Sequence, residues 1–196
     1  MAIKIATICG SVRPGNYTSK ALRLALEEFA KHADVEVTPF YLDKIDLPLP
    51  GQSAKDSAAV ERFRQTIKEA TGVLLASPEY HGGISSPMKL AIDNLGFPSV
   101  LAGKPISLLG VAAGVIGAIK SLEQLRGICS HVGALVLPLA VSMARVQQVF
   151  DEDGNCRDAD TEKSIRRAAV NLLDYIRGHI CPAVTLEAMT RQSGPH

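Results

Sequence analysis

The sequence predicts an α/β protein with a doubly wound sheet of five parallel strands, ordered 2-1-3-4-5, and helices on both faces. Three observations predict this fold. Short apolar, β-branched segments alternate with amphipathic segments about five times over 196 residues. Most of the apolar segments lack polar alternation, as strands buried on both faces do, whereas residues 35–38 alternate. The loops after strands one, three and four are the richest in Gly, Ser and Pro, and in this strand order they meet at one edge of the sheet.

Each element follows from its local pattern. The predicted strands cover residues 3–9, 35–40, 73–77, 106–111 and 134–137. The predicted helices cover residues 19–32, 57–70, 87–95, 119–131 and 161–177. Asp56 is the expected N-cap of the second helix, and Ser86 ahead of Pro87 that of the third. The Asp-Gly pair at residues 153–154 is typical of a hairpin turn. We expect one domain over residues 1–181 and a loose C-terminal tail over residues 182–196.

Composition excludes several classes of protein. The net charge of +1 and the low aromatic content argue against a nucleic-acid partner. The longest apolar stretch, residues 105–119, is too short for a membrane helix and contains three glycines. Four cysteines lie far apart, without metal-ligand spacing, and the N-terminus has no pattern of a secretion signal. We therefore expect reduced thiols and a cytoplasmic protein that binds neither metal nor membrane.

The loop at residues 10–20, GSVRPGNYTSK, joins the first strand to the first helix. Backbone N–H groups, hydroxyl groups and a helix N-terminus converge in such a turn, and a phosphate suits them best. The guanidinium of Arg13 can bind phosphate with two hydrogen bonds. Neither the Walker A pattern nor the dinucleotide-binding glycine pattern occurs here. A plain turn with an N-cap and a solvated arginine is the alternative.

Two further loops meet the same edge. In the loop at residues 78–83, PEYHGG, paired glycines allow close approach to a flat ligand, Tyr80 can flank a ring, and His81 can bond its polar rim. Glu79 has no catalytic partner, so we favour a solvated or helix-capping carboxylate. The loop at residues 112–117 offers little besides backbone. Tyr80 packed on a helix and His81 as an unengaged loop residue remain alternatives.

The three loops provide binding groups but no reactive side chain. The sequence contains no convincing Ser-His-Asp triad, metal-ligand cluster or coupled carboxylate pair. A site of this kind indicates that a cofactor carries the reaction.

GSVRPGNYTSKAL after a first strand, followed about sixty residues later by SPEYHGGISSPMKLAIDNLG, resembles the NADPH-dependent FMN reductase family. The resemblance implies a flavodoxin-like fold with bound FMN and no catalytic side chain. It implies a set of residues that hold the FMN phosphate, namely Ser11, Arg13, Asn16, Thr18 and Ser19. It implies a second set that borders the flavin ring, namely Pro78, Glu79, Tyr80, His81, Gly82, Gly83, Ala113 and Gly114.

The resemblance also implies an activity. Two electrons would pass from NADPH or NADH, through FMN, to a flavin, quinone, azo dye or chromate in a ping-pong cycle. A homodimer or homotetramer is implied as well, with the arm at residues 141–155 suited to contact a neighbour. His81 replaces an Asn found in many members, which leaves the choice of acceptor open. A flavodoxin-type electron carrier, or a redox-sensing flavin protein without turnover, is the alternative.

Overall fold

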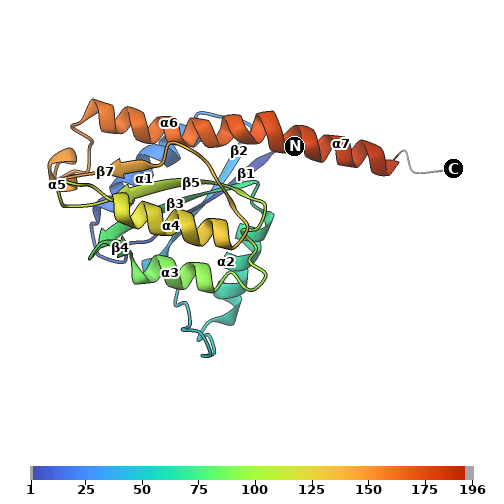
Figure 1. Cartoon of the computed structure of the whole chain (residues 1–196), viewed down its shortest axis with the longest axis horizontal. Coiled ribbons are helices and arrows are strands. Elements are labelled where there is room, and N and C mark those ends of the chain that lie inside the picture. Colours follow the sequence, from blue (N-terminus) through green and yellow to red (C-terminus); the bar gives the residue numbers. More distant parts are fainter. Residues whose placement is uncertain (1, 193–196) are drawn as a thin grey trace.

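The structure is a computed structural model that describes residues 2–192. A parallel sheet forms its central layer, in the order β2-β1-β3-β5-β6 (Figure 1). These strands are β1 (Ile3–Cys9), β2 (Val35–Tyr41), β3 (Gly72–Tyr80), β5 (Pro105–Val111) and β6 (Leu135–Val136). Every residue of β5 and almost every residue of β1 is buried, as expected for strands covered on both faces.

The α/β class and the parallel sheet are confirmed, but the five-strand order 2-1-3-4-5 is wrong. The sheet has seven strands, because β4 (Gly83–Ile84) pairs antiparallel with β3 and β7 (Val141–Met143) pairs with β5. The strand predicted at residues 134–137 is interrupted and resumes as β7. Pro138 lacks a backbone donor and Leu139 has a φ of 67°, so neither continues a strand.

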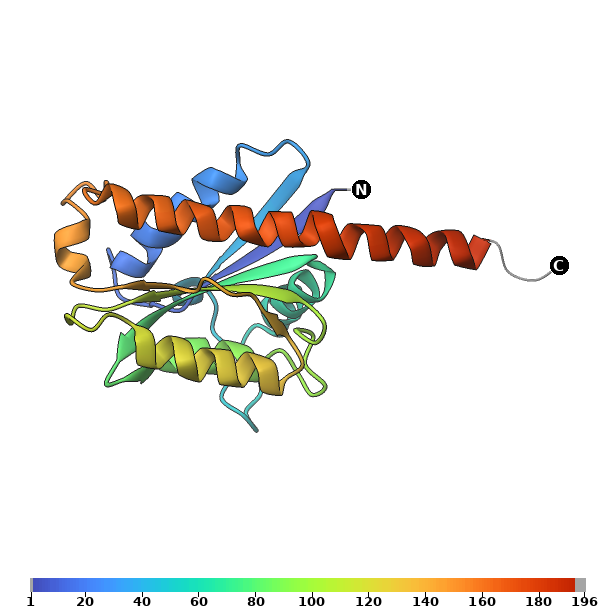
Figure 2. The ribbon, with the colours of Figure 1, turned by 45° about the horizontal axis from the view of Figure 1, so that its top comes forward.

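Helices cover the two faces of the sheet separately (Figure 2). On one face, α1 (Tyr17–Phe29) and α6 (Ala159–Tyr175) bury their apolar residues together with those of the sheet. On the other face lie α2 (Ser57–Glu69), α3 (Ser86–Asp93) and α4 (Ile119–His131). Two short helices, η1 (Leu42–Lys44) and α5 (Val146–Val149), complete the connections. No helix in the described part of the chain has the length and apolarity to cross a membrane.

A polar side chain caps the N-terminus of each of the helices α1, α2 and α3. Asp56 accepts from the N–H of Ala59, as predicted. The predicted N-cap of α3 was wrong by one residue: Ser85, not Ser86, is the cap, and its hydroxyl accepts from the N–H of Met88. Pro87 still lies in the first turn, where its missing donor is harmless.

The last helix is longer than the sequence predicted. After α6 the chain passes through one π-helical turn, η2 (Ile176–Ile180), into α7 (Cys181–Gln192), which extends beyond the sheet (Figure 1). The loose tail predicted from Pro182 is therefore helical as far as Gln192, and residues 193–196 lie outside the described range. In the π turn the N–H of Cys181 bonds to the carbonyl of Ile176, five residues earlier. This wider turn accommodates Pro182, which has no N–H to donate.

All four cysteines are free, and two of them are fully buried. Burial raises the pKa of the Cys9 thiol to about 11 and that of the Cys129 thiol to about 12. Both thiols therefore stay protonated and shielded at neutral pH, whereas Cys156 and Cys181 are partly exposed.

We predict that Ellman's reagent at about pH 8 labels only Cys156 and Cys181 in the folded protein, because the other two thiols are buried and un-ionised. All four should react after unfolding in guanidinium chloride. The Cys156→Ser, Cys181→Ser double variant should show no fast-reacting thiol while folded. Fast labelling of that variant would contradict the buried positions of Cys9 and Cys129.

Candidate functional site

The loops after β1, β3 and β5 lie at the carboxyl edge of the sheet, as the strand pattern predicted. Contacts join the first two loops directly. The hydroxyl of Ser85, at the start of α3, donates to the carbonyl of Gly10 at 2.6 Å. A Cβ on Gly10 would lie 3.0 Å from the Met88 side chain, so only glycine allows this close approach.

The first loop contains a cradle of unused hydrogen-bond donors. Ser11 and Thr18 are each 2% exposed, yet neither hydroxyl has a partner within residues 2–192. Neither oxygen is among the fully enclosed side-chain atoms, so both can reach a ligand. In the same part of the chain, the N–H groups of Tyr17 and Thr18 at the start of α1 also lack an acceptor. Free hydroxyls and amides at a helix N-terminus are the donors that a phosphate requires.

Asn16 and Ser19 hold the shape of this cradle. The Asn16 side-chain oxygen accepts from the N–H of Ser19 at 2.7 Å, and its amide nitrogen donates to the carbonyl of Arg13 at 2.7 Å. The Ser19 hydroxyl donates back to the carbonyl of Asn16 at 2.8 Å. Beneath them, the Cys9 thiol lies 3.9 Å from the same Asn16 oxygen. Of the residues predicted to hold a phosphate, these two are therefore already bonded within the loop.

Arg13 connects the first loop to the second. Its guanidinium carbon lies 4.7 Å from the centre of the Tyr80 ring, which is a cation–π contact. Stacking uses the flat face of the guanidinium and leaves its N–H groups directed outward in the plane. Arg13 can therefore contact Tyr80 and donate to an anion at the same time.

The second loop is a tight β-hairpin rather than an open glycine-rich loop. Glu79 pairs with Ile84, and Tyr80 with Gly83, so that only His81 and Gly82 form the turn. Both turn residues have positive φ, 50° and 75°, which is the conformation of a two-residue hairpin. Gly82 therefore supplies the turn, and Gly83 belongs to β4.

Two hydrogen bonds to α4 hold this hairpin in place. The Glu79 carboxylate accepts from the N–H of Ser121 at 3.0 Å, and Gln124 accepts from the N–H of Ile84 at 2.8 Å. Because Ala118, the N-cap of α4, has no side-chain acceptor, Glu79 caps the helix from the end of β3. Of the two roles expected for Glu79, a solvated or a helix-capping carboxylate, the structure shows the helix-capping one. A Cβ on Gly83 would lie 2.9 Å from the Gln124 oxygen, so the hairpin packs closely on α4.

The third loop is attached to the segment that follows β7. The carbonyl of Gly114 accepts from the N–H of Arg145 at 3.1 Å, and that of Ala113 from the Gln147 side chain at 3.3 Å. No hydrogen bond or ring contact in the described structure joins Ala113 or Gly114 to the first two loops. The third loop therefore lies at the same edge, but the residues that position it are those that follow β7 and not those of the first two loops.

Three residues that organise the site were missed in the sequence: Ser85, Gln124 and Ser142. Ser85 joins the first loop to α3, Gln124 holds the hairpin, and the Ser142 hydroxyl accepts from the N–H of Ala118 at 2.9 Å. The start of α3 was a usable signal for Ser85, since the Ser-Ser-Pro run allows either serine to cap. Gln124 and Ser142 act across the fold, and no local pattern marks them.

Within the described chain, no group of three or more His, Cys, Asp or Glu side chains could hold a metal ion. A cavity of about 410 Å³ adjoins the hairpin and is lined by Leu49, Pro50, Gly83, Ile84, Ser86, Lys89, Leu90, Asp93 and Gln124. The edge thus presents donors for an anion in the first loop, and of the residues expected to border a ring only Gly83 lines this cavity.

Comparison with known structures identifies the fold. The chain superimposes with a TM-score of 0.74 on a flavoenzyme NAD(P)H:acceptor oxidoreductase from Paracoccus denitrificans, at 23% sequence identity over 91% of this chain and 99% of that one. This likeness shows a flavodoxin-like fold.

Sequence comparison then identifies the family. Residues 3–148 match the profile of the NADPH-dependent FMN reductases, and the chain belongs to that family. It is 31% identical over 182 residues to an NAD(P)H-dependent FMN reductase of Pseudomonas aeruginosa, covering 89% of this chain and 96% of that protein. It is also 31% identical over 175 residues to a 2-hydroxy-1,4-benzoquinone reductase of a Burkholderia species, covering 85% and 92%.

We predict that Glu79→Ala lowers the free energy of unfolding by about 0.5–2 kcal/mol, because α4 loses its cap. Glu79→Gln keeps an acceptor oxygen and should lose less than half as much. Urea denaturation followed by circular dichroism measures both. Equal stability of Glu79→Ala and the wild type would show that the Ser121 contact does not stabilise the fold.

Proposed function

We propose that the cradle of the first loop holds the phosphate of FMN and that the hairpin borders its ring. Membership of the family makes FMN the cofactor and NAD(P)H the electron donor of this chain. The observation that carries the placement is the set of unpartnered donors at Ser11, Thr18 and the start of α1, next to the exposed guanidinium of Arg13. Such a set fits a phosphate dianion and few other groups.

When bound, FMN accepts two electrons from NAD(P)H and passes them to a second substrate. The residues of the chain bind and orient the reactants for this exchange. Ser11, Thr18 and Arg13 anchor the phosphate, while Asn16 and Ser19 keep the loop in its binding conformation. Tyr80 and the turn at His81 and Gly82 form the wall beside the ring. Because the fixed loops would hold two flat rings near each other, positioning would supply most of the rate enhancement.

The same edge favours flat, uncharged acceptors. Val115 and Ile116, in the third loop, are 67% and 69% exposed, and they give this loop an apolar surface. We infer that quinones, flavins and azo dyes are the acceptor class and that Ala113 and Gly114 close the far side of the ring. One domain over residues 1–181, self-assembly and a cytoplasmic location also belong to this proposal. Family membership, the sheet and the free thiols support it.

We predict that Arg13→Ala weakens FMN binding by about 1.5–3 kcal/mol, which is roughly 10- to 150-fold, because a charge-assisted hydrogen bond to the phosphate is lost. Quenching of FMN fluorescence measures the affinity. Turnover of a benzoquinone with NADPH should recover when FMN is saturating. Arg126→Ala, which removes an exposed cation of α4, is the matched control. An unchanged FMN affinity in Arg13→Ala would remove Arg13 from the phosphate site.

We also predict that the FMN-loaded protein loses its yellow absorbance when NADPH or NADH is added without oxygen, and regains it when a benzoquinone follows. An electron carrier without reductase activity would keep its colour with both nucleotides. A protein that retains no flavin after reconstitution would contradict the proposal and favour a role without turnover.

A further inference from the structure

Three residues other than glycine have a positive φ within residues 2–192. They are His81, Leu139 and Arg145, with φ angles of 50°, 67° and 46°. His81 forms the hairpin turn, which requires this conformation, and Leu139 lies where the chain is interrupted between β6 and β7. Arg145 instead lies between β7 and α5, at the carboxyl edge of the sheet. Its side chain crowds the backbone in this conformation, and strained residues of this kind gather at binding and active sites.

Hydrogen bonds to the third loop impose this backbone conformation. The N–H of Arg145 donates to the carbonyl of Gly114 at 3.1 Å, and the carbonyl of Arg145 accepts from the N–H of Gln148 at 2.8 Å. The next residue, Val146, donates its N–H to the carbonyl of Ala112 at 3.1 Å. The backbone at Arg145 is therefore fixed to the loop that is expected to close the far side of the ring.

The side chain of Arg145, by contrast, makes no contribution to the fold through polar contacts. Arg145 is exposed, and its guanidinium has no hydrogen-bond or ion-pair partner in the described part of the chain. Arg166 and Arg177 each donate to a carboxylate. The guanidinium of Arg145 thus keeps all of its N–H donors for a ligand. A strained backbone that presents a free cation indicates a binding role rather than a structural one.

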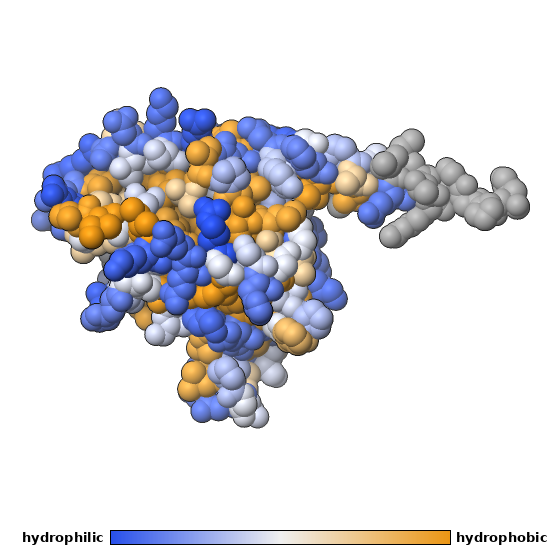
Figure 3. Space-filling model, in the orientation of Figure 1, coloured by the Kyte–Doolittle hydropathy of each residue, from blue (hydrophilic) through white to orange (hydrophobic). Residues whose placement is uncertain are grey.

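The surroundings of this cation are apolar and lack acidic residues close in sequence. Neither residues 112–118 nor residues 138–150 contain Asp or Glu. Val115 and Ile116, at the tip of the third loop, are exposed. Apolar surface gathers at the end of the molecule where α5 and the third loop lie (Figure 3). A free guanidinium beside apolar surface suits a molecule that combines flat rings with phosphate groups.

We propose that Arg145 binds a phosphate group of NAD(P)H and is a specificity-determining residue for the electron donor. Of the reactants of the family's reaction, NAD(P)H combines flat rings with phosphates, and the phosphate of FMN is already assigned to the first loop. This inference rests on the proposed function, because Gly114, to which the Arg145 backbone bonds, belongs to the proposed wall of the ring. The nicotinamide would lie on that ring, with its phosphates within reach of the guanidinium.

Two phosphate positions on the electron donor have the required chemistry. The pyrophosphate occurs in both NADPH and NADH, whereas the 2′-phosphate occurs only in NADPH. The flat guanidinium can donate two N–H groups to either of them. A comparison of the two nucleotides therefore shows which phosphate Arg145 binds.

The test uses Arg145→Asn in the FMN-loaded, full-length protein. Because Asn adopts a left-handed backbone more readily than Arg does, the variant should resist urea at least as well as the wild type. On anaerobic mixing, the dissociation constant for NADPH should rise about tenfold or more, as for a lost charge-assisted hydrogen bond. The limiting rate of flavin bleaching should stay the same, because Arg145 lies away from the reacting atoms. An equal loss with NADH assigns the pyrophosphate, and an unchanged NADH affinity assigns the 2′-phosphate.

Two further measurements sharpen the result. Arg145→Lys keeps the charge but not the two-pronged geometry, so its loss of affinity should be intermediate. The oxidised nucleotides NADP⁺ and NAD⁺ transfer no electrons to the flavin, and calorimetry with them should give the same ranking of the variants. If Arg145→Asn does not fold, Arg145→Gly, which also suits this backbone, replaces it.

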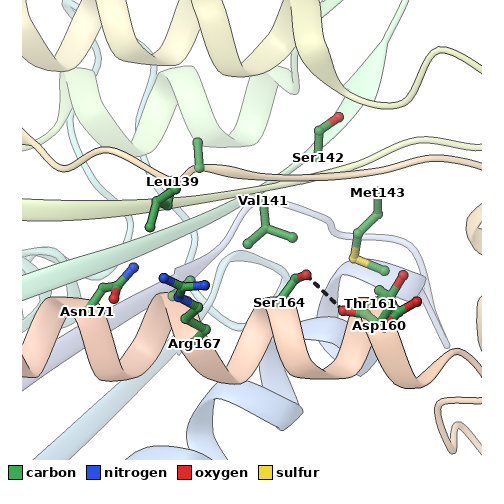
Figure 4. A pocket seen from close by; sticks show the side chains of 11 residues that line it. Leu139, Val141, Ser142, Met143, Asp160, Thr161, Ser164, Arg167 and Asn171 are labelled. Carbon is green, nitrogen blue, oxygen red and sulfur yellow. Dashed lines mark hydrogen bonds between the residues drawn. The ribbon is translucent and has the colours of Figure 1, made fainter.

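Arg167→Asn is the matched control, since it removes the same charge from another part of the surface. Arg167 is exposed, has no ion-pair partner among the described residues, and lines the groove between α6 and β7 (Figure 4). This variant should bind both nucleotides like the wild type. An equal loss in Arg167→Asn would reduce the effect to overall charge and overturn the proposal.

Three other outcomes separate this inference from the proposed function. Unchanged affinity of Arg145→Asn for both nucleotides, in a protein that binds FMN, contradicts the inference alone. Weaker FMN binding in Arg145→Asn would place Arg145 in the cofactor site and would also overturn the inference. A wild type that binds no FMN contradicts the proposed function itself.

Discussion

The buried hydroxyl of Ser85 joins the two parts of the molecule on which the proposed cofactor edge depends. It accepts from the N–H of Met88 to begin α3, and it donates to the carbonyl of Gly10 at the end of β1. The loop after the first strand and the helix after the third are therefore held at a constant separation. Because Ser85 is fully buried, an unpaired carbonyl at Gly10 would have no water to replace the bond.

A division of roles follows from this fixed separation. Asn16, Ser19 and Glu79 make internal hydrogen bonds that hold the loops, while Ser11, Thr18 and Arg13 retain free donors. A preorganised site loses little conformational entropy when a ligand binds, since the protein has already ordered the groups that contact it. Family membership says that FMN is bound, and this division suggests which side chains contact it.

The hairpin of the second loop shows why a glycine pattern alone is ambiguous. PEYHGG predicts close approach of backbone to a flat ligand, yet Gly82 supplies a turn with positive φ and Gly83 packs against Gln124. Both uses need a residue without a Cβ, so the sequence alone does not distinguish a glycine that approaches a ligand from one that forms a turn or packs closely. The same tertiary contacts decide that Glu79 caps α4. The sequence of the loop alone left two roles open for Glu79, a solvated carboxylate and a helix-capping one.

Local patterns were sufficient for β1, β2, β3 and β5, for the cap at Asp56, and for the edge at which the loops meet. Strands that are buried on both faces need continuous apolar residues, and parallel strands bring their carboxyl ends to one edge. Both features can therefore be predicted from residues that are close together in the sequence. The break between β6 and β7, the helix beyond Pro182 and the contacts of Ser85, Gln124 and Ser142 depended on the tertiary structure. Each of them involves partners far apart in the chain, or a turn geometry that several local sequences satisfy equally well. Contacts between distant parts of the chain, hydrogen bonds among them, decided which local structure formed.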